Sequence, residues 1–95
     1  MDPIQRAVLD IVEGRNEVAL SGNRESFSYL QFRNRVWLHT IGDTMTQKTE
    51  VSQVSEEEVL RVLFWKVRER TGHYGPDDGA VSWQDVLEYF RAGHY

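Results

Sequence analysis

Cysteine is absent from this chain of 95 residues, and proline occurs only twice. Without cysteine the protein can form no disulfide, thiolate nucleophile, zinc ribbon or iron–sulfur centre, and it suits a reducing compartment. The chain contains no apolar run near the roughly 20 residues that span a bilayer. Its first residues, Met-Asp-Pro-Ile, lack the basic and apolar regions of a signal peptide. The sequence therefore predicts a cytoplasmic protein with no membrane partner.

Lysine is also scarce, because nine of the eleven basic residues are arginine. The net charge is −4, and it is unevenly spread: residues 43–58 carry −4, whereas residues 15–42 carry +2. Hydrophobic residues make up 40% of the chain, which is ordinary for a globular protein. A chain of this length supports one modest core, so residues 1–95 are expected to form a single domain.

Three helix starts are marked by capping-box pairs, in which a polar side chain and the residue three positions later bond each other's backbone N–H groups. The pairs are Asp2 with Gln5, Ser55 with Glu58, and Ser82 with Asp85. A further helix is expected from Ser26 or Ser28 to His39 or Ile41, ended by Gly42. The predicted fold class is mainly α, a compact single domain of about four helices at residues 2–13, 26–41, 55–70 and 82–91.

Strand signals are weaker than helix signals in this chain. Residues 17–21 alternate as a short strand does, and residues 43–54 suggest either a loop or a loop with one ragged edge strand at about 49–53. The mainly α prediction therefore allows a two-stranded β ribbon, formed by Val18–Leu20 with either Val51 or Val81.

The helix at residues 55–70 is expected to be the centre of the fold. Its main apolar stripe recurs with a period of 3.6 residues and consists of Leu60, Leu63, Phe64 and Val67, widened by Val59 and Val62. Trp65 falls outside that stripe and shares a second face with Arg61 and Arg68. This second face is either another packing surface or an exposed contact for a partner.

Catalytic and metal-binding patterns are missing. The histidines are His39, His73 and His94, and none pairs with another at the spacing of a helical metal site. His39 is expected at a helix end, where it would bond the last carbonyl groups. The chain has no nucleophile elbow, phosphate-binding glycine loop or paired carboxylates. We expect no enzyme activity, no catalytic residue, no metal and no cofactor.

Residues 78–87, Asp-Gly-Ala-Val-Ser-Trp-Gln-Asp-Val-Leu, resemble the second half of an EF-hand loop and its exiting helix. Gly79 holds the sharp-turn position and Asp85 the position of the bidentate acid. The resemblance implies calcium ligation, but the first half of the loop departs from the pattern. Its first and third ligand positions are Tyr74 and Pro76, which offer no carboxylate. Calcium is therefore not expected here.

Two functions from different classes fit the remaining features. The main hypothesis is a small non-enzymatic protein-interaction module: an adaptor, inhibitor or subunit, such as a phage, viral or bacterial accessory protein. Its partner would be another protein or a second copy, bound through Arg61, Trp65 and Arg68, because tryptophan and arginine dominate binding hot spots. The alternative is a helix-turn-helix or winged-helix-like DNA-binding regulator that uses residues 24–39. Its contacts would be side chains that bond bases and phosphates: Arg24, Gln31, Arg33, Asn34 and Arg35.

Overall fold

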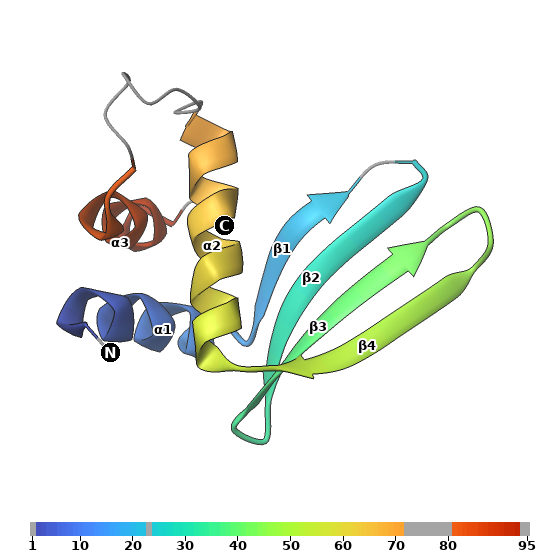
Figure 1. Ribbon diagram of the computed structural model, residues 1–95, viewed down its shortest axis with the longest axis horizontal. Helices are drawn as coiled ribbons and strands as arrows, with labels where there is room; N and C mark the ends of the chain where they lie inside the picture. Colours follow the sequence, from blue (N-terminus) through green and yellow to red (C-terminus); the bar gives the residue numbers. More distant parts are fainter. Residues whose placement is uncertain (1, 23, 72–80, 94–95) are drawn as a thin grey trace.

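The fold combines an antiparallel sheet with helices gathered at one side of it (Figure 1). The computed structural model describes residues 2–22, 24–71 and 81–93. Along these residues the chain forms one helix, then four strands, then two helices. The class is therefore α+β, and the expectation of a mainly α domain of about four helices is wrong.

The helices within the described ranges are α1 (Pro3–Arg15), α2 (Glu56–Thr71) and α3 (Trp83–Arg91). Asp2 and Gln5 form the predicted capping box of α1, and Ser82 and Asp85 form that of α3. At α2 the hydroxyl of Ser55 accepts a backbone N–H from the first turn at 3.2 Å. These side chains satisfy N–H groups that the first turn leaves unpaired, so all three starts could be located from the sequence.

The sheet is a meander in which each strand pairs with the next, in the order β1-β2-β3-β4. The strands are β1 (Glu17–Gly22), β2 (Ser26–Arg33), β3 (Val36–Asp43) and β4 (Lys48–Val54). Asn34 and Arg35 alone separate β2 from β3, and their φ angles are 51° and 64°. A two-residue turn with both φ angles positive matches the twist of an antiparallel hairpin. It holds β2 and β3 in register along their whole length.

Residues 26–41, the expected second helix, form the β2–β3 hairpin instead. Their apolar side chains do not make one helical stripe, because the sheet divides them between two faces. Leu30 and Trp37 point toward the helices and are at most 2% exposed. Phe27 and Tyr29 point the other way and stack, with ring centres 6.1 Å apart. Large apolar groups on both faces remove the alternation by which a half-buried strand is recognised.

Both short strands suggested by the sequence are present, but the expected ribbon is not. Residues 17–21 lie in β1, and residues 49–53 lie in β4. The error is in the pairing: β1 lies against β2, and Val51 of β4 lies opposite Thr40 of β3. Val81, the other candidate for the ribbon, precedes α3 outside any strand.

One apolar core joins the three helices to the sheet. Leu63 and Val67 of α2 are fully buried, as the apolar stripe of this helix predicts. Phe64 is partly buried, and its ring packs against that of Trp83 in α3. The buried members are Val8, Leu9 and Val12 of α1; Val18, Leu30 and Trp37 of the sheet; Val59, Leu60, Leu63 and Val67 of α2; Val81; and Val86, Leu87 and Phe90 of α3.

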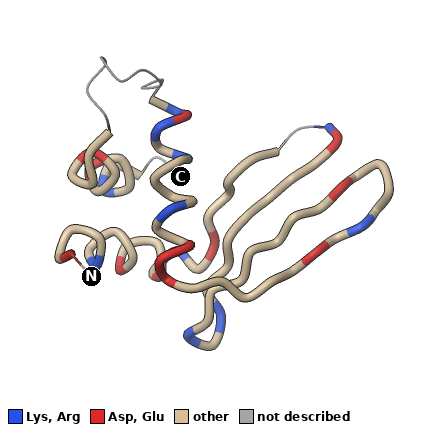
Figure 2. Tube along the Cα trace, in the orientation of Figure 1, with Lys and Arg blue, Asp and Glu red and all other residues tan. Residues whose placement is uncertain are grey.

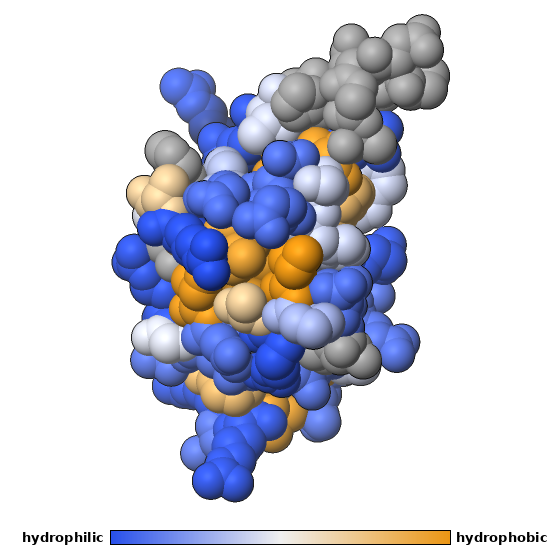
Figure 3. All heavy atoms as spheres, turned by 90° about the vertical axis from the view of Figure 1, so that its left-hand side faces the viewer, coloured by the Kyte–Doolittle hydropathy of each residue, from blue (hydrophilic) through white to orange (hydrophobic). Residues whose placement is uncertain are grey.

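On the side of α1 and α3, a small apolar area lies among polar side chains (Figure 3). Helix α1 leaves Ile4, Ala7 and Ile11 partly exposed. A small apolar area of this kind is common on soluble proteins and does not by itself indicate a binding site. No helix in the described ranges is long and apolar enough to cross a membrane.

Candidate functional site

The outward side of α2 carries Arg61, Trp65 and Arg68, which we call the Trp65 face. The side chain of Trp65 is 46% exposed. The guanidinium carbon of Arg68 lies 4.8 Å from the centre of its ring, within the range of a cation–π contact. Arg61 bonds Glu58 through its Nε at 2.9 Å, and this bond lowers the pKa of the Glu58 carboxyl. The structure thus brings the three predicted interface residues together on one surface.

A pocket of about 250 Å³ adjoins the Trp65 face, between α2 and the first three strands. Val62, Trp65, Lys66 and Glu69 contribute the α2 side of this pocket. The strands contribute Leu20, Ser21, Ser28 and His39. A partner that covers Trp65 would therefore also meet a hollow with apolar walls, two hydroxyl groups and charged side chains.

Lys66 is the most deeply buried charged residue of the described part, with 5% of its surface exposed. Its ammonium group donates a hydrogen bond to the carbonyl oxygen of Ala19, where the β1–β2 register shifts. Burial lowers the pKa of Lys66, and the positive charge of Arg70 lowers it further. The lysine thus joins α2 to β1 and satisfies a backbone carbonyl group beside the sheet edge.

The strands bring hydroxyl groups and a histidine to the wall of this pocket. The hydroxyl groups of Ser21 and Ser28 lie 2.8 Å apart and share a hydrogen bond. His39 is in β3, not at a helix end as expected, so its predicted role there is wrong. Its Nε2 atom is buried and has no hydrogen-bond partner among the residues that the structure describes. Among these described side chains, no base is held against a nucleophile.

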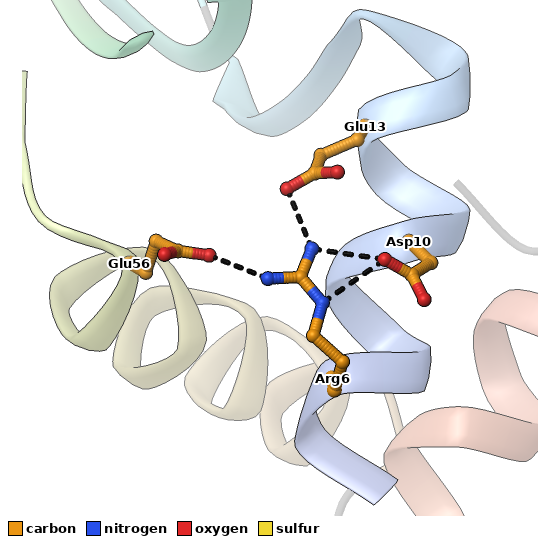
Figure 4. A network of polar contacts seen from close by, with 4 residues as sticks. All are labelled: Arg6, Asp10, Glu13 and Glu56. Atoms are coloured by element: carbon orange, nitrogen blue, oxygen red, sulfur yellow. Dashed lines mark hydrogen bonds and ion pairs between the residues drawn. The ribbon is translucent and has the colours of Figure 1, made fainter. Parts of the chain in front are cut away.

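A second polar cluster joins α1 to the start of α2 (Figure 4). The Arg6 guanidinium bonds Glu13 at 2.8 Å, Asp10 at 2.9 Å and Glu56 at 2.9 Å. These bonds, with that of Glu13 the strongest, raise the pKa of Arg6. The guanidinium and the three carboxylates are already engaged with one another, which is the pattern of a structural contact between two helices.

The residues of the nucleic-acid hypothesis do not lie on a recognition helix. Gln31 and Arg33 belong to β2, and Asn34 and Arg35 form the turn after it. Arg24 lies at the other end of β2, in the connection from β1. A strand of this length separates its two ends by roughly 25 Å. Figure 2 shows the basic groups at opposite ends of the hairpin. The recognition helix that the helix-turn-helix and winged-helix hypotheses need at residues 24–39 is therefore absent, whereas nucleic-acid binding itself stays an untested prediction.

Lys66 and His39 are the site residues that sequence reasoning missed. Lys66 lies three residues after Leu63 on α2, so it continues the buried side of the helix. Its burial could therefore have been predicted from this spacing. His39 could not be placed without knowing that β3 was a strand. Residues 78–80 of the EF-hand resemblance lie outside the described residues, as do the ligand positions Tyr74 and Pro76, and Asp85 serves as a capping side chain. His73 and His94 also lie outside them.

No group of acidic or histidine side chains able to hold a metal ion is found within residues 2–22, 24–71 and 81–93. Comparisons of the chain with protein-family models, with curated proteins and with solved structures find no match.

Proposed function

We propose that the protein is a non-enzymatic interaction module that binds another protein through the Trp65 face. The observation that carries the proposal is the exposure of Trp65, 46% of its surface, on a helix whose opposite side is fully buried. An exposed tryptophan leaves much apolar surface in contact with water. A partner that covers the tryptophan removes this surface from water, and its burial contributes favourable free energy to binding.

The neighbours of Trp65 support the same function. Arg68 lies over the ring, so its guanidinium is held close to the exposed apolar surface. Tryptophan and arginine are enriched among the residues that contribute most to protein interfaces. The adjoining pocket of about 250 Å³ offers a recess for one side chain of the partner. Arg24 and Arg33 lie at opposite ends of β2 and not on one helix face, so the proposal names a protein partner and not nucleic acid.

Affinity capture from the source cells, quantified for each protein that co-purifies, tests this proposal. A tagged wild-type chain and its Trp65→Ala variant are compared under the same conditions. Truncation of a hot-spot residue costs about 2 kcal/mol or more, which is roughly a thirtyfold loss of affinity. We therefore expect at least one protein to be captured by the wild type and largely lost by Trp65→Ala.

Met45→Ala is the matched control, because Met45 is the most exposed large apolar residue of the described part, at 79%, and lies far from α2 in the β3–β4 connection. It should capture the same protein as the wild type. Circular dichroism must show that Trp65→Ala remains folded. Equal capture of every protein by the wild type and Trp65→Ala would contradict the proposal.

A further inference from the structure

The two edges of the sheet differ in how far they are open to another strand. Strand β1 has a register shift between Ala19 and Ser21, and the Lys66 ammonium group is bonded to the Ala19 carbonyl. A bulge and a charged side chain at an edge both hinder the addition of a strand. Strand β4 has no register shift: it pairs with β3 in unbroken register over seven residues, six of which are exposed, and its charged residues are Lys48 and Glu50.

The backbone groups that β4 turns outward can be identified from the register. The two-residue turn makes Arg33 and Val36 a hydrogen-bonded pair, and such pairs alternate along an antiparallel ladder. Val36 and every second residue after it therefore bond β2, whereas the intervening residues of β3 bond β4. Their partners in β4 are the even-numbered residues from Lys48 to Val54. The N–H and C=O groups of Thr49, Val51 and Gln53 consequently point away from the sheet.

The outward-bonding residues of β4 are all uncharged, and the strand is complementary to itself. If two copies pair antiparallel about a twofold axis at Val51, each Val51 faces the other, and Thr49 faces Gln53 of the second copy. The charged residues are also matched without conflict, since Glu50 faces Ser52 of the second copy and Lys48 faces its Val54. No like charges lie directly opposite one another in this register.

We propose that β4 is a self-association edge, through which two copies of the chain join their sheets into one continuous eight-stranded sheet. Three hydrogen-bonded pairs supply about six backbone hydrogen bonds across the axis. Because the β1 edge is obstructed, the addition of strands stops at two copies and gives a closed, symmetric dimer. This surface is separate from the Trp65 face and does not depend on the function proposed for it.

The absence of cysteine makes disulfide trapping a direct test of the register. Across the axis the two Val51 Cα atoms should lie about 5.5 Å apart, within the range of a disulfide. Val51→Cys should therefore form covalent dimers under mild oxidation. Thr49→Cys is the matched control, because its two copies are separated by four residues along the strand, about 13 Å, which is too far for a disulfide.

In a second test, sedimentation velocity measures the dimerisation of the Val51→Pro and Val51→Thr variants. Proline removes only an N–H that points outward, so the β3–β4 ladder keeps its hydrogen bonds. Loss of the two central hydrogen bonds should raise the dissociation constant of the dimer at least about tenfold. Val51→Thr, which keeps the N–H, should dimerise like the wild type, and Trp65→Ala should do so too.

Several results would overturn the proposal. One is a wild-type chain that sediments as a monomer from micromolar to millimolar concentration. Another is a dimer in which Thr49→Cys is trapped as readily as Val51→Cys, and a third is a dimer lost in Trp65→Ala. If Val51→Pro proves unfolded by circular dichroism, the comparison of the two cysteine variants decides the question.

Discussion

Gly42 determines how side chains pack on the face of the sheet that the helices do not cover. The ring of Phe27, on the neighbouring strand, lies directly over Gly42, and a Cβ at this position would overlap it. The aromatic ring thus covers a backbone position that has no side chain of its own. The glycine was expected to end a helix, whereas its actual role is to leave space for an aromatic ring in a strand.

Gly42→Ala is therefore expected to destabilise the protein by about 1–3 kcal/mol, the usual cost of overpacking. Urea denaturation followed by circular dichroism measures the effect. Gly14→Ala is the matched control, because Gly14 lies in α1, and a methyl group added there would have no other atom within 4 Å. It should gain roughly 0.5–1 kcal/mol from helix propensity. If Gly42→Ala is as stable as the wild type, the ring of Phe27 is not held over this site.

Among the elements, those with local chemical signals could be predicted and those specified by distant contacts could not. The helix starts depend on side chains a few residues away, such as Asp2 with Gln5, so the sequence displays them directly. The β2–β3 hairpin depends on pairing between strands and on a sheet with apolar groups on both faces. Its turn, Asn34–Arg35, lacks the glycine that usually follows asparagine in such turns. Without that glycine the usual sequence signal of a two-residue hairpin turn is absent, so the hairpin was not predicted.

Arg35→Gly should stabilise the hairpin, because a φ of 64° strains an arginine but not a glycine. The expected gain is about 0.5–1 kcal/mol in the free energy of unfolding, measured by urea denaturation. Arg33→Gly is the control at the end of β2, where the backbone is extended and glycine should cost a similar amount. A loss of stability in Arg35→Gly would mean that the Arg35 side chain makes contacts that outweigh the strain.

The Trp65 face was predictable because it depends on one helix. The spacing of Arg61, Trp65 and Arg68 places them together on any helix that buries the Leu63 stripe. The pocket beside them was not predictable, since it unites α2 with three strands whose order the sequence does not reveal. The open β4 edge likewise emerges only when the register of the whole sheet is known.

For the molecule as a whole, two kinds of contact hold the helices together, an apolar core and the Arg6 ion-pair network. Leu63 is fully buried at the centre of the core. Arg6 is bonded to three carboxylates, but its side chain is 41% exposed. Exposed ion pairs contribute little because water competes for the charges, whereas a buried leucine leaves a cavity when it is truncated. Stability should therefore depend far more on Leu63 than on Arg6.

Leu63→Ala is expected to cost about 2–5 kcal/mol, a large part of the stability of a small domain. Arg6→Met keeps most of the aliphatic stem and should cost about 1 kcal/mol or less. Urea denaturation at low and at high salt separates the two contributions, because salt screens the Arg6 pairs and leaves the effect of Leu63→Ala unchanged. If Arg6→Met proved as costly as Leu63→Ala, and the cost persisted at high salt, the junction of α1 with α2 would depend on a desolvated network instead of on the core.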